Sequence, residues 1–524
     1  MRTLCFSFSA LLWSCFMSWQ PAVAQQGVAV PDLSEVLGRM KQLEDLVSRH
    51  EQKIKELEAA LSRQTQSERT APAVLNSSAE TRDQGSSTST GTQIVPDAKS
   101  QSTPTAAGAS AQVSNPEYSE PPSGSFSAVR NTFSIISRDQ LFRLRIGAHL
   151  QADGKTIYGD KSYYDESPHQ FTDEFIVRRA RPIFEGNLGQ YVEFRIMPDF
   201  GNGKALLYDA YADLTLAPYA VIRGGKFKTP LGLEQSQNDA DLTFIERSLA
   251  TDLVPNRDEG FEFYGNFRNR VSYEAAVLNG APVGQSYDGD QNNGKDVVGR
   301  IFLTPFAPSG SETLKGLGFG IAGSSGRQEG AVLPSFNSTG GQIPFFAYGS
   351  GSGSTAVMPN AAGRRLNYTP QLYYYNGPFG LMFEYAVSAQ KVSAVVSGDT
   401  LVHNFSNNAW QVAASYVLTG EKKSFGSIVP GRGLESRMVK GLGAWEVVGR
   451  YTGLNVDPSV FADGFADRTK SAESARAWTV GLNWYLNYFS RVELNYEQTH
   501  FQGGNLIGNR PTEKIFEERL QVAF

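Results

Sequence analysis

Arginine side chains lie on one face of the most regular segment of the chain, residues 142–152. Phe142 and Leu144 alternate there with Arg143 and Arg145, and the alternation continues to the end of the segment. Strict period-two alternation is typical of a β-strand with one apolar and one polar side. A planar guanidinium can donate two hydrogen bonds at once to a phosphate or carboxylate group. The polar side therefore predicts a surface that pairs with such anions.

Further strands with the same alternation carry more arginines on their polar faces. The complete set of candidate cations is Arg143, Arg145, Arg179, Arg181, Arg195, Arg223, Arg450, Arg491 and Arg519. The same faces also carry the acids Asp153, Glu193, Asp199, Asp209, Asp213, Glu262, Glu274, Glu384, Glu446, Glu493 and Glu497. Two interpretations stay open for each arginine: it faces a solute, or it pairs with an acid in a cross-strand ladder that stiffens the wall.

Catalytic chemistry finds little support in the sequence. Both cysteines, Cys5 and Cys15, lie within the first 24 residues, so the rest of the chain has no thiol for nucleophilic, redox or metal chemistry. The segment Gly224–Lys226 lacks the spacing and the following Ser or Thr of a phosphate-binding loop. The histidines show no metal-ligand spacing; they are His50, His149, His169, His403 and His500. We expect no catalytic residue, no metal and no cofactor, and hence no enzyme. The alternative is a hydrolase carried on the barrel, which would need a Ser, a His and an acid that meet in space.

Sixteen segments with strand character position these side chains. They are residues 142–152, 175–184, 191–199, 207–216, 220–228, 261–266, 271–278, 297–304, 317–323, 368–374, 379–388, 409–418, 444–452, 477–486, 490–499 and 515–524. An even number of strands of about 9 to 11 residues suits a closed barrel in an outer membrane, because closure leaves no unpaired backbone in lipid. We predict an all-β fold, a sixteen-stranded antiparallel transmembrane β-barrel.

The connections between these segments alternate in length, as such a barrel requires when both of its termini lie in the periplasm. The short ones are residues 185–190, 217–219, 267–270, 376–378 and 487–489, and the long ones include 153–174, 229–260, 324–367 and 453–476. Residues 305–316 and 419–443 are exceptions. A soluble sandwich or propeller is the competing fold, but aromatic residues near the strand ends favour an interfacial girdle: Trp410, Tyr416, Trp445, Tyr451, Trp478 and Trp484. The terminal Phe524 resembles the signal by which barrels are inserted into a Gram-negative outer membrane.

Composition and the N-terminal region complete the domain plan. The 524 residues carry a formal net charge of −5, which provides no basic field for nucleic acid. Arg2, the apolar residues 4–17 and the small residues before Gln25 predict a signal peptide over residues 1–24. A membrane anchor, or a lipid anchor on Cys15, is the alternative. No later apolar run is long enough to span a bilayer as a helix.

Between the signal peptide and the barrel, two segments differ sharply in pattern. Apolar residues repeat every seven positions from Leu33 to Leu61, interrupted only by His50, which predicts an α-helical coiled coil of three or more chains over residues 25–61. A single amphipathic helix is the alternative. Residues 62–127 are rich in Ser, Thr, Gln, Ala, Pro and Gly and predict a disordered, flexible linker. The barrel is then predicted over residues 128–524.

Several longer motifs follow one another in the predicted barrel. They are Arg178-Arg179-Ala180-Arg181, Phe184-Glu185-Gly186, Asp209-Ala210-Tyr211, residues 225–234 (GKFKTPLGLE), residues 241–248 (DLTFIERS), residues 481–486 (GLNWYL) and residues 494–497 (LNYE). Together they resemble the phosphate-selective porin O and P family. The resemblance implies a trimeric, sixteen-stranded pore in which arginines line the channel and the third outer loop folds inward to narrow it.

The predicted constriction loop, residues 229–260, is acidic. Its seven acids against two arginines give a net charge of −5, and its candidate site residues are Glu234, Asp239, Asp241, Glu246, Arg247, Asp252 and Arg257. The family resemblance implies a basic residue just before the DLTF stretch of phosphate-selective members, whereas this chain has Ala240 there. Selectivity in a pore depends on the charges that face the lumen. Two outcomes therefore stay open: passage of phosphate or other small anions, or a general or cation-preferring pore.

These observations predict an outer-membrane porin for passive diffusion in a Gram-negative bacterium, with its N-terminal segment in the periplasm. The expected partners are two further copies in a homotrimer, outer-membrane lipid and lipopolysaccharide, the barrel-assembly machinery through Phe524, and small solutes, but no nucleic acid. A structural role is the alternative, in which the coiled coil on its long linker tethers the barrel to the envelope.

Overall fold

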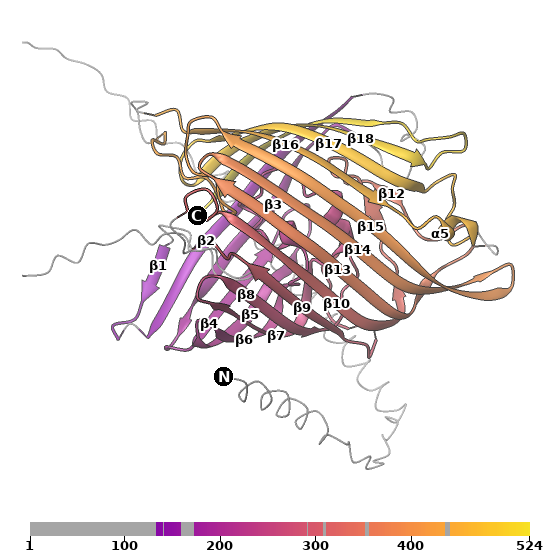
Figure 1. Ribbon diagram of the computed structural model, residues 1–524, viewed down its shortest axis with the longest axis horizontal. Coiled ribbons are helices and arrows are strands. Elements are labelled where there is room, and N and C mark those ends of the chain that lie inside the picture. Colours follow the sequence, from indigo (N-terminus) through magenta and orange to yellow (C-terminus); the bar gives the residue numbers. More distant parts are fainter. Residues whose placement is uncertain are drawn as a thin grey trace, which may run out of the picture. The chain divides into compact units, whose positions relative to one another are not determined.

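The computed structural model describes residues 133–139, 141–158, 172–290, 292–307, 311–351, 356–434 and 441–524. Within these ranges sixteen antiparallel strands close into a barrel (Figure 1). The predicted signal peptide, coiled coil and linker lie outside the described residues. Among the described residues, no helix is long and apolar enough to cross a bilayer.

The barrel strands are β2 (Phe142–Tyr158), β3 (Glu174–Leu188), β4 (Val192–Asp199), β5 (Leu206–Ala217), β6 (Ala220–Lys228), β7 (Arg257–Phe267), β8 (Val271–Leu278), β9 (Asp296–Leu303), β10 (Leu317–Val332), β13 (Asn360–Asn376), β14 (Phe379–Val396), β15 (Asp399–Val417), β16 (Ala444–Asn455), β17 (Ala472–Tyr485), β18 (Ser490–Gly503) and β19 (Glu513–Ala523). Shorter elements are β1 (Phe133–Ile136), β11 (Phe336–Asn337), β12 (Pro344–Phe346), α4 (Leu233–Ser236), α5 (Ser459–Ala462) and the 3₁₀ helix η1 (Leu249–Leu253).

Each of the sixteen predicted segments corresponds to one barrel strand, so the predicted all-β barrel is confirmed. The predicted boundaries were wrong at the long-loop end. Strands β14 and β15 continue to Val396 and from Asp399, where residues 389–408 had been left outside any strand. Ser397 and Gly398 join them with positive φ angles of 53° and 94°, as a tight hairpin turn requires. The predicted loop 324–367 likewise contains the end of β10, β11, β12 and the start of β13.

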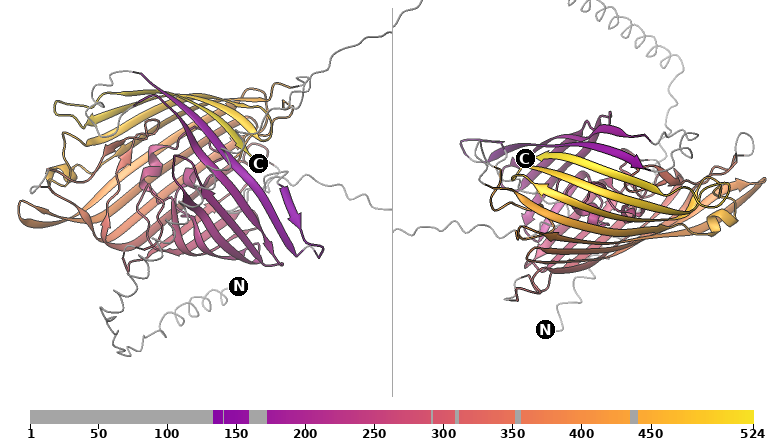
Figure 2. Two further views of the ribbon diagram at one scale, coloured as in Figure 1. Left: turned by 180° about the vertical axis from the view of Figure 1, so that it is seen from behind. Right: turned by 90° about the horizontal axis from the view of Figure 1, so that it is seen from above.

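The barrel closes where its first and last strands pair, which we call the closing seam. Strand β19 pairs with β2 from Lys514 opposite Tyr158 to Ala523 opposite His149. The short β1 pairs with the part of β2 that β19 leaves uncovered, with Phe133 opposite Ile146. Figure 2 shows the C-terminal end beside the first strands of the barrel.

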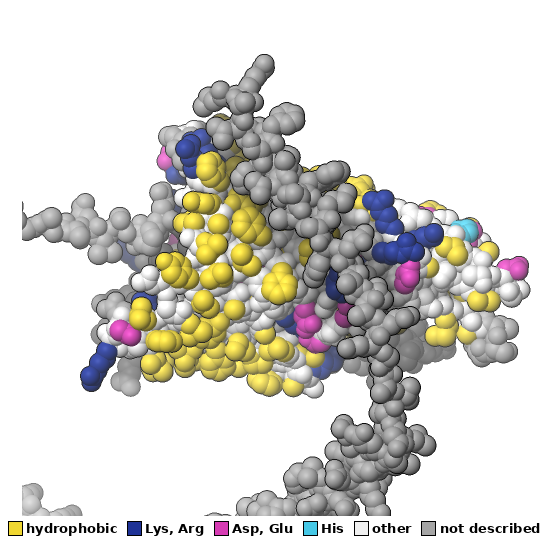
Figure 3. Space-filling view, turned by 90° about the horizontal axis from the view of Figure 1, so that it is seen from below, with side chains coloured by type: hydrophobic (Ala, Val, Ile, Leu, Met, Phe, Trp, Pro, Cys, Tyr) yellow, Lys and Arg dark blue, Asp and Glu magenta, His cyan; other side chains and the backbone are white. Residues whose placement is uncertain are grey.

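The two faces of the wall differ in chemistry, because alternate side chains point to opposite sides of each strand. The outer face exposes large apolar side chains such as Ile196, Phe261 and Val297. Figure 3 shows one outer face, on which hydrophobic side chains form a broad band with charged side chains at its margins. Trp445 and Trp484 stack on neighbouring strands with ring centroids 4.9 Å apart. The inner face carries the polar residues that build the candidate site.

Candidate constriction and channel wall

The connection between β6 and β7, residues 229–256, folds back across the interior of the barrel; we call it loop L3. It contains the short helices α4 and η1, and most of its side chains are buried. Its contacts reach strands far around the barrel. The backbone N–H of Leu233 donates to Glu384 Oε1 on β14 (2.6 Å), and Arg450 Nη1 on β16 lies 3.5 Å from Glu234 Oε1. Loop L3 therefore narrows the lumen, as the family resemblance implied.

Glu234 fixes loop L3 against this opposite wall. Its carboxylate accepts hydrogen bonds from the backbone N–H and the hydroxyl of Ser248, at 2.9 and 2.6 Å, and from Gln411 at 3.0 Å. Ser248 lies on the same loop, whereas Gln411 and Arg450 belong to the wall. The acid is therefore consumed in holding the loop and does not face a passing solute.

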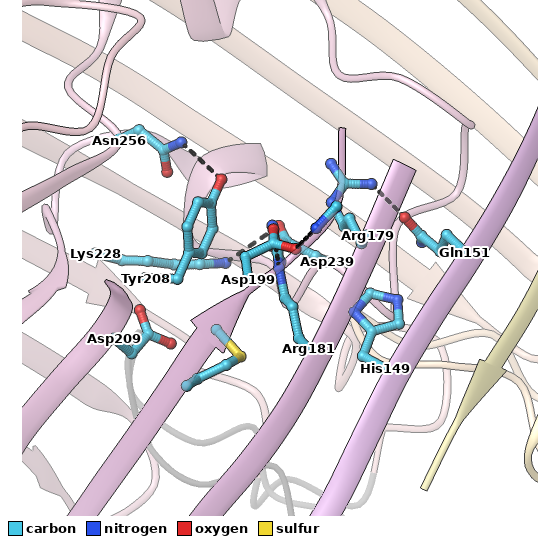
Figure 4. Close-up of polar contacts among 12 residues, drawn as sticks. His149, Gln151, Arg179, Arg181, Asp199, Tyr208, Asp209, Lys228, Asp239 and Asn256 are labelled. Carbon is cyan, nitrogen blue, oxygen red and sulfur yellow. Dashed lines mark hydrogen bonds and ion pairs between the residues drawn. The ribbon is translucent and has the colours of Figure 1, made fainter. Parts of the chain in front are cut away.

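Asp239 occupies the centre of a cluster of cations where loop L3 meets β3, β6 and β7. Arg181 and Arg247 form ion pairs with its carboxylate, and the side-chain nitrogens of Arg257 and Lys228 lie 3.6 and 3.8 Å away (Figure 4). Burial alone would raise the pKa of Asp239, but the surrounding cations outweigh it and hold that pKa well below its ordinary value. Asp239 is therefore ionised, and four positive charges surround it.

Tyr208 separates two of these cations. Its ring lies 3.9 Å from the guanidinium carbon of Arg181 and 3.8 Å from that of Arg257, within cation–π distance of both. The pairing of β4 with β5 skips Tyr208, because Met197 pairs with Asp209 and Pro198 with Leu207. Such a bulge inserts one extra residue into a strand and changes the direction of the neighbouring side chains. It brings Tyr208 and Asp209 into the same cluster (Figure 4).

A second bulge, on β3, brings two neighbouring arginines to the constriction. Gln151 pairs with Arg179 and Ala152 with Val177, which leaves Arg178 as the extra residue. Arg178 forms an ion pair of 2.7 Å with Glu246 of loop L3. Arg179 is buried and donates to the neutral amide oxygen of Gln151. In the described part of the chain, Arg179 has no carboxylate partner.

The other predicted wall arginines lie beside acids. The shortest pairs are Arg145–Glu185 at 3.2 Å, Arg195–Glu185 at 2.8 Å, Arg223–Asp213 at 2.7 Å, Arg450–Glu497 at 3.4 Å, Arg491–Glu493 at 3.2 Å and Arg519–Asp153 at 2.6 Å. Arg143 is exposed at the turn end of β2. The paired arginines form the cross-strand ladders that were one of the two interpretations of their alternation.

The remaining predicted acids of loop L3 have separate partners. Glu246 pairs with Arg178 and lies 3.8 Å from Arg519. Asp241 accepts from the backbone N–H of Ser427 at 3.1 Å. Asp252 accepts from the backbone N–H of Asn337 at 2.8 Å, and burial raises its pKa to about 7. None of these carboxylates is left facing a free lumen without a hydrogen-bond donor.

A segment from the turn end of the barrel also enters the lumen. Residues 419–434, between β15 and β16, contact loop L3 from that side: Gln237 Nε2 donates to the carbonyl oxygen of Phe425 at 2.6 Å, and Lys423 Nζ donates to Thr243 Oγ1 at 3.2 Å. The sequence analysis recorded only the unusual length of this turn and missed its contribution to the constriction. That length was the available signal.

The charge balance around Asp239 is positive. Five cations (Arg179, Arg181, Lys228, Arg247 and Arg257) outnumber three acids (Asp199, Asp209 and Asp239) in the cluster. A cavity of about 470 Å³ lies beside it, lined by Arg145, Arg181, Arg195, Glu185 and His149 among others. The acidic composition of loop L3 is thus reversed locally by cations that the wall supplies.

Comparison with known sequences places the chain in a family. Residues 145–524 match the family described as phosphate-selective porin O and P. The chain belongs to this family. A relative is Porin O of Pseudomonas aeruginosa, which is 23% identical over 399 residues that cover 69% of this chain and 84% of that protein. The protein is therefore an outer-membrane porin.

Solved structures of other outer-membrane proteins are also similar to the barrel. The OmpT protein of Vibrio cholerae has a TM-score of 0.46 and 10% identity, with 74% of this chain and 99% of that chain covered. The channel DcaP of Acinetobacter baumannii has a TM-score of 0.47 and 9% identity, with the same two shares covered.

Proposed function

We propose that the porin passes small anions, inorganic phosphate among them, in preference to cations. The observation that carries this proposal is the cluster around Asp239, in which five cations face three acids at the narrowest, loop-filled part of the lumen. Charges that line a constriction act at short range and in a reduced dielectric, so a small excess there outweighs the net charge of the whole chain.

Arg179 is the residue that we expect to contact the solute. Its present partner is the neutral amide of Gln151, whereas Arg181 and Arg257 are already paired with carboxylates. Exchange of a neutral acceptor for a charged oxyanion strengthens a hydrogen bond, because charge-assisted bonds are about twice as strong as neutral ones. An anion therefore gains more at Arg179 than at a paired arginine.

The test is the zero-current potential of the purified porin in a planar bilayer under a KCl gradient, repeated with phosphate on one side. We expect the sign of an anion-permeable pore and a chloride current that phosphate reduces. Arg179→Gln removes the charge and should lower the anion preference severalfold, while Arg179→Lys retains the charge and serves as the matched control. A cation-permeable sign in the unmodified protein would establish the acidic residues of loop L3 as dominant and refute the proposal.

We also propose that three copies assemble into a trimer with the N-terminal segment in the periplasm. The family membership supports the assembly, and the alternation of short turns with longer loops supports the orientation. Deletion of residues 25–127 separates two roles for the predicted coiled coil and linker. Loss of trimers would identify an assembly device, whereas intact trimers of unchanged conductance in a weakened envelope would identify a tether.

A further inference from the structure

A second cavity, of about 650 Å³, lies at the long-loop end of the barrel and shares no lining residue with the Asp239 cluster. The connection 279–295 and residues 331–336 form two of its sides, and strands β13, β14 and β15 form the floor. Its size falls in the range of small-molecule sites, about 300 to 1,000 Å³.

The polar lining of this cavity consists mainly of uncharged groups. It includes Gln328, Gln390 and Asn407, which are 2%, 9% and 4% exposed, and Ser388, which is 5% exposed. In the described part of the chain, the Ser388 hydroxyl has no hydrogen-bond partner. A buried hydroxyl without a partner can both donate to and accept from a ligand.

The charged groups in the lining are neutralised. Both Nε and Nη2 of Arg365 donate to Asp296 Oδ2, at 3.2 and 2.7 Å. The carboxylate of Asp290 pairs with Lys295 outside the lining. The cavity therefore offers no uncompensated charge to a phosphate or to a cation, in contrast to the Asp239 cluster.

An aromatic ring completes the site. Tyr348 follows β12, and its hydroxyl accepts from Asn407 Nδ2 at 3.3 Å while its ring meets that of Phe346 edge to face at 4.9 Å. These two contacts fix the ring at the wall of the cavity. Amide and hydroxyl groups around a fixed aromatic face match a sugar, whose hydroxyls both donate and accept and whose C–H face is apolar.

We infer that this cavity binds a neutral carbohydrate of one or two rings, held by Ser388, Gln390 and Asn407 and packed against Tyr348. The site lies on the loop side of the constriction, so it would collect the solute before passage. It goes beyond the proposed anion preference and does not depend on it, because the two sites have no residue in common.

The experiment measures binding of maltose, with glucose as a second probe, to the purified porin by saturation-transfer NMR and calorimetry. We expect saturable binding that Ser388→Val or Gln390→Leu weakens at least fivefold, and Tyr348→Ala, a change in a loop, provides a variant with little risk to the barrel strands. Retention of heat-modifiable electrophoretic mobility verifies that each variant is folded.

The matched control is Arg179→Gln, which should alter ion selectivity and leave maltose binding unchanged. Failure of maltose and glucose to bind, or binding that all three cavity variants leave intact, would overturn the inference without touching the proposed anion preference. Displacement of maltose by inorganic phosphate would also overturn it, since it would make the cavity an anion site.

Discussion

The two halves of loop L3 are held in place by different physics. Residues 234–247 are held by ion pairs and charged hydrogen bonds, with Asp239 among four cations. In residues 249–254, Leu249, Leu253 and Val254 are at most 1% exposed and lie in an apolar cluster. Their partners include Phe336, Phe345, Phe346, Phe405 and Phe465.

This difference separates two requirements of a constriction. Ion pairs weaken as salt screens them, whereas apolar burial is insensitive to moderate salt. The apolar half can therefore keep the loop in position while the charged half exchanges partners with a passing ion. The position of the loop and the selectivity of the loop should respond to different substitutions.

The largest expected effect comes from the apolar half. The double change Leu249→Ala and Leu253→Ala removes side chains from a packed cluster, at about 2 to 5 kcal/mol each. We expect loop L3 to leave the lumen, so that single-channel conductance in 1 M KCl rises severalfold and ion selectivity falls. Leu216→Ala, on the outer face at 59% exposure, is the control and should change neither quantity. Unchanged conductance in the double variant would show that the ion pairs alone hold the loop.

A smaller effect should follow from Asp239→Asn in the charged half. The change leaves the four cations without their shared carboxylate and makes the constriction more positive. We expect the anion-to-cation permeability ratio to rise severalfold in dilute salt, and the difference to shrink in 1 M salt, where the Debye length is about 3 Å. Asp252→Asn tests the same loop away from these cations and should leave the ratio unchanged.

The smallest effect is a dependence on pH at the junction of the two halves with β11. Burial raises the pKa of Asp252 to about 7, above its ordinary value of 3.8. A carboxyl with a raised pKa favours the closed form while protonated, and that stabilisation is lost as the pH rises through 7. We expect exchange protection of the Asn337 amide to fall by up to about 10²-fold between pH 5 and pH 8, after correction for intrinsic rates.

Asp252→Asn provides the control for that dependence. Its side chain does not ionise, so the protection of the Asn337 amide should be flat over the same pH range. Equal pH dependence in the two proteins would assign the titration to another group.

The sequence predicted every barrel strand because a wall between lipid and water requires period-two alternation along its whole membrane height. The outer parts of β14 and β15 were missed because residues 389–408 rise above the region in which alternation predicts a strand. The nine arginines were assigned to polar faces by the same periodicity, and their pairing with Asp153, Asp213, Glu493 and Glu497 follows from registers that join strands distant in sequence.

The constriction was harder to predict, since its contacts depend on single irregularities. The extra residues Arg178 and Tyr208 interrupt two strands without any compositional signal. The partners of Asp239 come from β3, β6, β7 and loop L3 itself, so a count of charges within the loop gave −5 where the assembled cluster is positive. Only the tertiary arrangement brings these charges together.

The closing seam has a consequence for how the chain is assembled. Its strands are nearly at opposite ends of the barrel sequence, and Arg519 donates to Asp153 across 366 positions at 2.6 Å. Pairing over such a separation is slow, because a long loop must close before the contact forms. A chain that emerges from its N-terminus presents an unpaired β2 edge until the last residues arrive, and an unpaired edge is costly in lipid. Completion of synthesis is therefore a condition for insertion, and a product that ends before β19 is left with two open edges as a substrate for periplasmic proteases.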